Sequence, residues 1–88
     1  MNTTTATRTQ ITESADAWLY ERGGDSPAFA TESDNCRYAR SYFYGDNARA
    51  NWYRALTDAK AGGFFVDSFV DDGDPAIVID AGKLAALA

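Results

Sequence analysis

Hydrophobic residues recur at two different spacings along this chain of 88 residues, and each spacing predicts one kind of element. Near the start, four apolar residues follow the helical spacing i, i+4, i+7 and i+8: Ile11, Ala15, Trp18 and Leu19. Two glycines follow at 23–24, and glycine readily adopts the left-handed conformation in which helices often end. The pattern predicts a helix over about residues 11–22.

A second helix is predicted from "ARANWYRALTDAKAGG", residues 48–63. Its apolar side comprises Ala48, Trp52, Ala55, Leu56 and Ala59. Asp46 or Asn47 can cap its first turn, and the glycines at 62–63 end it.

The segment between these helices fits two structures. Residues 23–34 are rich in turn formers and predict a loop with one apolar anchor, Phe29. Over residues 35–44, Cys36, Ala39 and Phe43 fit one side of a helix capped by Ser33 or Asp34. The tyrosines at 38, 42 and 44 also fit the alternation of a strand. We favour the helix.

The period changes in the C-terminal third. "GFFVDSFV" and "AIVID" are rich in Phe, Val and Ile, and the turn-forming "DDGDP" between them predicts a β-hairpin over about residues 64–80. Phe64, Val66, Ser68 and Val70 form the more apolar side, which we expect to meet the helices, so that Asp67 points outward. Asp80 can then cap a short helix in "AGKLAALA".

These elements predict an α+β fold, with two or three helices packed on a small antiparallel sheet that contains the C-terminal hairpin. A hydrophobic content of 45% with 24% charged residues is typical of a globular chain. We expect one domain over residues 10–88, preceded by a mobile, Thr-rich arm over residues 1–9.

The charge is divided along the chain, although the total is −5. Residues 37–54 contain four arginines and one acid, which gives +3 and leaves −8 for the remainder. An acidic total makes direct binding to nucleic acid unfavourable and suits a basic protein partner.

The residue types present leave few routes to catalysis. The chain has no histidine, so the commonest general base and metal ligand is absent. Cys36, the single cysteine, is interpreted as a buried apolar residue; the alternative, a thiol activated by a helix N-terminus and Arg37, lacks a base. The aspartates at 71, 72 and 74 do not have the spacing of an EF-hand. We therefore expect no enzyme, no cofactor and no metal.

Localisation is predicted from the same features. A lone cysteine fits a reducing compartment, and the first ten residues lack the pattern of a secretory signal. No apolar run is long enough to cross a bilayer. We expect a cytoplasmic protein that does not bind membranes.

Two sets of residues are candidates for binding a partner. The first is an acidic face on the hairpin, made of Asp67, Asp71, Asp72, Asp74 and Asp80. The second is the Arg/Tyr segment, with Arg37, Arg40, Tyr42, Tyr44, Arg49 and Arg54. Its arginines and tyrosines are the types that contact phosphates and stack on bases, but they are also enriched at protein interfaces. A third interpretation places the aromatic residues in the core and pairs the arginines with nearby acids.

In size, acidic charge and lack of catalytic groups, the chain resembles the small acidic proteins of phages and mobile elements that inhibit host defence, anti-CRISPR proteins among them. The resemblance implies a non-enzymatic module that inhibits or regulates a larger, basic protein, such as a nucleic-acid-binding complex. Two alternatives remain open. One is a single-stranded nucleic-acid-binding module that uses residues 37–54, and the other is a structural or assembly subunit, with which a homodimer is compatible.

Overall fold

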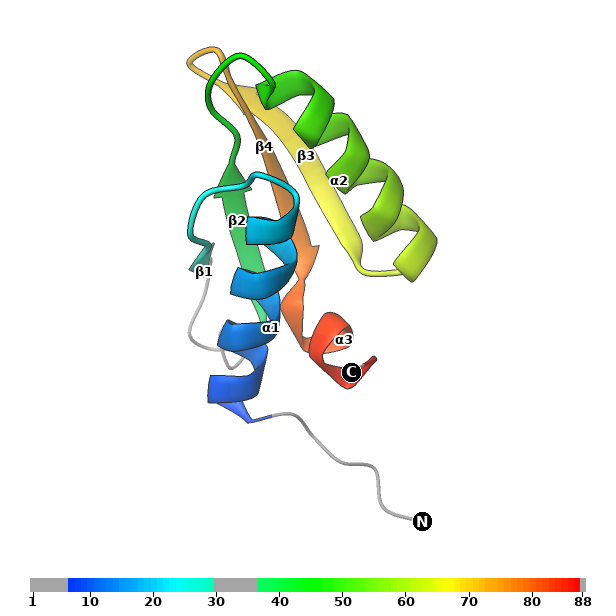
Figure 1. The fold of residues 1–88 in the computed structure, drawn as a ribbon. Coiled ribbons are helices and arrows are strands. Elements are labelled where there is room, and N and C mark those ends of the chain that lie inside the picture. The colour runs from blue at the N-terminus through cyan, green and yellow to red at the C-terminus, as the bar shows by residue number, and fades with distance from the viewer. Residues whose placement is uncertain (1–6, 30–36, 88) are drawn as a thin grey trace.

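The fold is a single antiparallel sheet of four strands with helices packed on one side (Figure 1). The computed structural model describes residues 7–29 and 37–87. In chain order the elements are α1 (Arg8–Glu21), β1 (Ala28–Phe29), β2 (Tyr38–Tyr42), α2 (Ala48–Gly62), β3 (Phe65–Asp71), β4 (Asp74–Asp80) and α3 (Ala81–Ala86). The strand order in the sheet is β1-β2-β4-β3. The predicted α+β class and the C-terminal hairpin are confirmed.

Helix α1 begins earlier than the apolar spacing predicts. Thr7 and Gln10 form a capping box: the Gln10 N–H donates to the Thr7 hydroxyl at 3.1 Å, and the Thr7 N–H donates to the Gln10 side chain at 2.8 Å. The first turn is therefore held by polar residues, which carry no apolar signal. Thr7, Arg8 and Thr9, which we had assigned to the Thr-rich arm, belong to the helix and its cap, whereas residues 1–6 lie outside the described part.

The preference for a helix over residues 35–44 is wrong, because residues 38–42 form strand β2. Each of these residues pairs with β4, from Tyr38 opposite Asp80 to Tyr42 opposite Ala76. The spacing of Ala39 and Phe43 fits a helix, but both side chains also lie on the same side of a strand, and both are fully buried. The alternation of the tyrosines was the correct signal. Ser33, Asp34 and Cys36, which belonged to the predicted helix, lie outside the described residues.

Helix α2 is confirmed almost residue for residue. It ends at Gly62, and Gly63 adopts a left-handed φ of 81° that lets its N–H bond back to the last turn. Asn47 occupies the cap position without making a side-chain hydrogen bond to the helix. Trp52, Ala55 and Ala59 are buried against the sheet, and the Trp52 indole N–H donates to the Ala76 carbonyl at 2.8 Å.

In the hairpin, the side chains that face the helices are not the ones predicted. A β-bulge lies between Phe65 and Asp67, so Val66 has no direct partner in β4 and is 44% exposed. Phe65 instead pairs with Ile79 and packs against the core, although we had expected it on the outer side. Val70 remains 46% exposed, contrary to the prediction. Asp67 is exposed, as expected, and Ser68 pairs with the buried Ile77.

The core lies between the helices and one side of the sheet. The helices contribute Ile11, Ala15 and Leu19 of α1, Trp52, Ala55 and Ala59 of α2, and Ala81 of α3. The strands contribute Ala39 of β2 and Ile77 and Ile79 of β4, and Phe43 and Phe64 lie next to the ends of β2 and β3. Phe29 of β1, a strand too short to be recognised by its pattern, packs against this cluster from the predicted loop. Asp80 caps α3 through a hydrogen bond from the Lys83 N–H, as predicted. No helix in the described residues has the length and apolarity needed to cross a membrane.

Candidate binding face of the sheet

The side of the sheet opposite the helices brings the two predicted residue sets together. Directly paired residues on neighbouring strands share a side of the sheet. The register therefore places Arg40, Val78 and Asp67 in one row, and Tyr42, Ala76 and Phe69 in the next. We define the open face as Tyr38, Arg40, Tyr42, Tyr44, Asp67, Phe69, Asp71, Asp74 and Val78. None of the core residues of α1 or α2 packs on this side.

Aromatic rings form the centre of the open face. The rings of Tyr42 and Tyr44 are stacked, with centroids 6.3 Å apart and an angle of 18° between their planes. Phe69 of β3 meets the Tyr42 ring edge-on, at 6.2 Å and 90°. These contacts orient three rings: Tyr42 of β2, Tyr44 just after that strand, and Phe69 of β3 on the other side of β4. Tyr44 stays 55% exposed, so its ring is available for a further contact.

A carboxylate of the acidic face is joined directly to this aromatic centre. The Tyr42 hydroxyl donates to Asp71 Oδ2 at 3.0 Å. This hydrogen bond, together with partial desolvation and the Asp71 charge, raises the pKa of Tyr42 above its ordinary value. The phenol therefore remains neutral at neutral pH and keeps the proton that it donates to Asp71. Asp71 is opposite Asp74 at the end of the hairpin, and so the two carboxylates are neighbours.

Tyr44 lies in a negative environment. Burial of part of its ring raises the pKa of its hydroxyl, and the charges of Asp25, Asp74 and Asp71 raise it further. Asp25 lies beside β2 because its backbone N–H donates to the Tyr42 carbonyl at 3.0 Å. Among residues 7–29 and 37–87, neither Asp25 nor Asp74 forms an ion pair with an arginine or lysine. The negative potential around Tyr44 is therefore not neutralised within the described fold.

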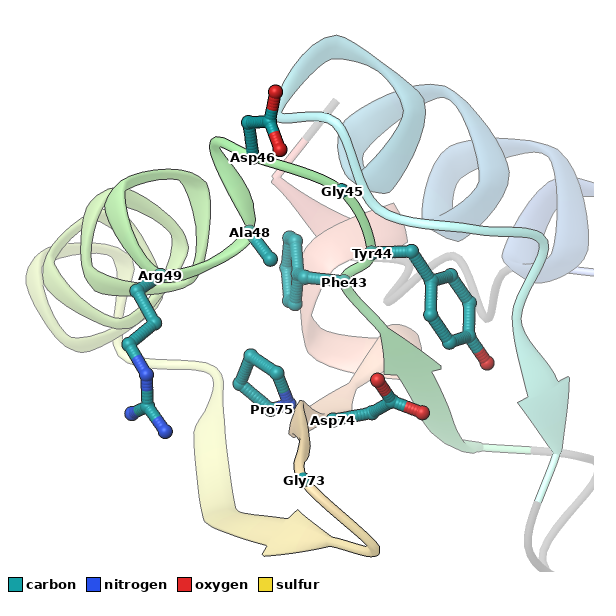
Figure 2. Close-up of a pocket in the computed structure, with 9 residues that line it drawn as sticks. All are labelled: Phe43, Tyr44, Gly45, Asp46, Ala48, Arg49, Gly73, Asp74 and Pro75. Atoms are coloured by element: carbon teal, nitrogen blue, oxygen red, sulfur yellow. The ribbon is translucent and has the colours of Figure 1, made fainter.

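A pocket of about 290 Å³ adjoins Tyr44 where the hairpin turn meets the start of α2 (Figure 2). Among the residues that line it, Phe43 and Pro75 lie between Tyr44 and Asp74 on one side and Arg49 on the other. The side chain of Asp74 points toward the side occupied by the Tyr44 ring. The pocket thus continues the open face around the end of the sheet.

Arg40 is the cation of the open face. Its guanidinium carbon lies 6.0 Å from the centroid of the Tyr42 ring. Its Nε atom is buried and has no hydrogen-bond partner. Arg40 precedes Tyr42 by two residues in β2, and Tyr44 follows it by two residues, just beyond the end of the strand. One neighbour of the Tyr42 ring is thus a cation, whereas the other is a second ring.

Asp67 protects the outer edge of the sheet. Among the described strands, β3 pairs with β4 alone and so lies at one edge of the sheet. The Asp67 side chain accepts a hydrogen bond of 2.8 Å from the Ser68 N–H. A carboxylate and a bulge are both features that discourage the edge-to-edge pairing of strands. The role of Asp67 is therefore partly structural.

Asp80 and Arg37, which both belonged to the predicted sets, lie beside Tyr38, at the end of the open face away from Tyr44 and Asp74. Asp80 is buried and accepts hydrogen bonds from Arg37 Nε at 3.0 Å and from the Lys83 N–H at 3.0 Å. Burial alone would raise the pKa of Asp80, but the Arg37 and Lys83 hydrogen bonds and charges outweigh it, and the pKa is lowered. This pair joins the end of β4 to the residue that precedes β2; the Asp80 carboxylate is buried in it, whereas the Arg37 side chain stays partly exposed.

The other two predicted arginines lie on α2 rather than on the sheet. Arg49 is near the Trp52 ring, at 5.9 Å, and lines the pocket. Arg54 Nη2 lies 3.4 Å from the Glu21 carbonyl at the end of α1. Asp72 occupies the hairpin turn next to Asp71. The structure therefore brings Arg40, Tyr42 and Tyr44 together with Asp67, Asp71 and Asp74, and separates them from Arg54.

Sequence reasoning missed three contributors to this region: Phe69, Asp25 and Tyr38. Phe69 follows Asp67 by two residues and so shares its strand side, a signal that the sequence already contains. Asp25 is brought to β2 by a contact distant in sequence, which no local pattern shows. Within the described residues, no group of three or more Cys, Asp or Glu side chains is arranged to hold a metal ion.

Comparison with known proteins adds no family to this description. No model of a known protein family matches the chain, and no curated protein or solved structure is significantly similar to it. The proposals below therefore depend on the residues of the open face.

Proposed function

We propose that the protein is a non-enzymatic, acidic protein-binding module that inhibits or regulates a larger basic protein, and that the open face is its binding surface. The observation that carries this proposal is the junction of an ordered aromatic cluster with carboxylates on a side of the sheet that the helices leave uncovered. It is represented most directly by the hydrogen bond between Tyr42 and Asp71.

The composition of the open face supports a protein partner. Tyrosine and arginine are the residue types enriched where interfaces gain most of their binding energy, and a polar rim commonly surrounds them. Here the stacked tyrosines, Phe69 and Arg40 are central, and the aspartates of β3 and the hairpin turn form the rim. A rim of one sign steers a partner of the opposite sign and increases its rate of association.

The charge of the same face favours a basic protein over nucleic acid. An exposed aromatic sheet can stack on bases, but phosphates would approach Asp67, Asp71, Asp72 and Asp74 with Arg40 as the one cation of the open face. Carboxylates in this arrangement suit the basic groove of a protein that itself handles nucleic acid. Inhibition by occupying such a groove, as in anti-CRISPR proteins of phages, is the form of regulation that we propose.

The test is an affinity capture from the native host that compares three forms of the protein. In the first variant, Asp71→Lys and Asp74→Lys reverse two charges on the open face. In the matched control, Glu13→Lys and Asp16→Lys make the same change in net charge on exposed positions of α1. We expect a basic protein to be retained by the wild type and the control and lost by the first variant, with circular dichroism confirming that all three forms fold.

Two outcomes would overturn the proposal. If the open-face variant retains the same partner as the wild type, the binding surface lies elsewhere. If the wild type binds single-stranded RNA or DNA in a fluorescence titration at low salt, and that binding is weakened by Arg40→Gln, the open face is a nucleic-acid platform instead.

A further inference from the structure

Arg40 and Tyr42 of β2, and Tyr44 two residues beyond the end of that strand, form a row that ends in a partly exposed ring. The Arg40 guanidinium carbon lies 6.0 Å from the centroid of the Tyr42 ring, and the Tyr44 ring is stacked on Tyr42 at 6.3 Å. Tyr44 has Tyr42 on one side and is 55% exposed. The stack therefore holds its outer ring in a fixed orientation, which lowers the entropic cost of placing a further planar group on it.

Charges around that free ring select the kind of group that fits. Asp74 lies on the Tyr44 side of the pocket (Figure 2), and Asp25 is held beside β2 by its backbone bond to Tyr42. Neither carboxylate forms an ion pair in the described fold. Arg49 lines the same pocket, but Phe43 and Pro75 lie between it and the Tyr44 ring (Figure 2). A cation on the Tyr44 side gains attraction from the ring face and from two or three carboxylates at once.

Geometry distinguishes between the two common protein cations. A guanidinium is planar, so it can lie flat on a tyrosine ring and still donate two parallel hydrogen bonds to one carboxylate. An ammonium is a compact, strongly hydrated point charge that cannot do both. The pocket beside Asp74 has room for the aliphatic part of a long side chain, with Pro75 and Phe43 as its apolar wall.

We propose that Tyr44 and Asp74 form a seat for an arginine side chain of the bound protein, with its guanidinium stacked on the Tyr44 ring. This inference rests on the function proposed above and specifies how the partner is anchored. The bound arginine then follows Arg40, Tyr42 and Tyr44 as a fourth member of the row, so that the two rings have a cation at each end. Asp25 and Asp71 supply the surrounding negative charge, and Asp74 accepts the directed hydrogen bonds.

The test uses peptides as defined probes. Three blocked peptides of identical length contain glycine alternating with arginine, with lysine or with citrulline, the last being planar like arginine but uncharged. Binding to the full chain is followed by NMR at low salt, through the shifts of Tyr44 and Asp74. We expect the arginine peptide to bind about 3–10-fold more tightly than the lysine peptide, and the citrulline peptide to bind most weakly.

Variants assign the binding to the seat. Tyr44→Ala and Asp74→Asn should each weaken binding of the arginine peptide about 3–10-fold. Tyr20→Ala is the matched control, because Tyr20 is an 81% exposed tyrosine on α1, away from the sheet. Equal binding of the arginine and lysine peptides, or an equal effect of Tyr20→Ala and Tyr44→Ala, would overturn the inference.

The same experiment separates this inference from the proposed function. If the charge reversal at Asp71 and Asp74 abolishes capture of the basic partner while the peptides show no preference for arginine, the open face binds the partner without an arginine seat. If capture is also unaffected, the proposed function itself is wrong.

Discussion

Arg37 and Asp80 form a two-pronged contact in which Arg37 Nε lies 3.0 Å from each carboxylate oxygen of Asp80 and Nη2 lies 2.8 Å from one of them. The same carboxylate caps α3, so one buried side chain connects the start of β2, the end of β4 and the last helix. Removing its charge should loosen all three.

We expect Asp80→Asn to lower the free energy of unfolding by about 1–2 kcal/mol at neutral pH. Asparagine still caps a helix, so the loss reports the charge. Because the pKa of Asp80 is lower in the folded protein than in the unfolded chain, its contribution is complete above the ordinary aspartate pKa of about 3.9 and is lost as the pH falls through the lower, folded-state pKa. Urea unfolding at a series of pH values measures both effects.

The control for this prediction is Asp16→Asn, which removes an exposed carboxylate of α1. It should change stability by less than about 0.5 kcal/mol at neutral pH. A difference between wild type and Asp80→Asn that stays constant down to strongly acidic pH would show that the charge of Asp80 is not what stabilises the contact.

Titration of Tyr42 should report its bond to Asp71. Asp71→Ala removes both the hydrogen-bond acceptor and the negative charge, and we expect the raised pKa of Tyr42 to move back toward its ordinary value. Asp71→Asn keeps an acceptor and should lower the pKa less. NMR of the tyrosine rings across the alkaline range measures this change, and Tyr42→Phe identifies the resonance. An unchanged Tyr42 transition in Asp71→Ala would contradict the contact.

The Asp67 carboxylate at the edge of the sheet should limit self-association of the protein. Asp67→Val leaves the Ser68 N–H without its acceptor and places a strand-favouring side chain on β3. We expect this variant to reach a higher mean mass than the wild type at equal concentration, measured by light scattering. Asp72→Asn removes one charge from the turn while tolerating its left-handed backbone, and serves as the control. If both variants behave alike, net charge rather than the edge limits association.

The coarse fold could be predicted from the sequence because its signals are local. The apolar spacing of α2, its terminal glycines and the turn residues of the hairpin each act over a few residues. Strand β2 could not be assigned in the same way, since Ala39 and Phe43 suit either a helix or a strand, and pairing with β4, some forty residues later, decides between them. No local pattern in the sequence shows the bulge at Val66 either, and this bulge turns the Phe65 side chain toward the core.

For the same reason, only part of the candidate site could be predicted from the sequence. The acidic set and the Arg/Tyr set were each recognisable by composition. That Tyr42 and Asp71 touch follows only from the order β1-β2-β4-β3, which places Phe69 and Asp71 across β4 from Tyr42. Asp80 looked like its neighbours in sequence and differs only because it is buried against Arg37.

The hairpin turn should be sensitive to its backbone conformation. Asp72 and Gly73 have φ values of 51° and 85°, the paired positive angles of a type I′ turn. Gly73→Ala should destabilise the protein by about 1 kcal/mol through the backbone alone, because an added Cβ at this position meets no other atom within 4 Å. Asp72→Asn is expected to be neutral or slightly stabilising, since asparagine tolerates this region well. Thermal unfolding compares the two, and equal melting temperatures for Gly73→Ala and wild type would contradict the prediction.

That turn also determines on which side of the protein the charge appears. Side chains of a strand alternate between its two sides, so a shift of β3 by a single residue would turn Asp67 and Asp71 toward the helices and bring Ser68 and Val70 to the outside. Two backbone angles at Asp72 and Gly73, in residues that need not touch any partner, therefore keep the carboxylates outward and the surface acidic.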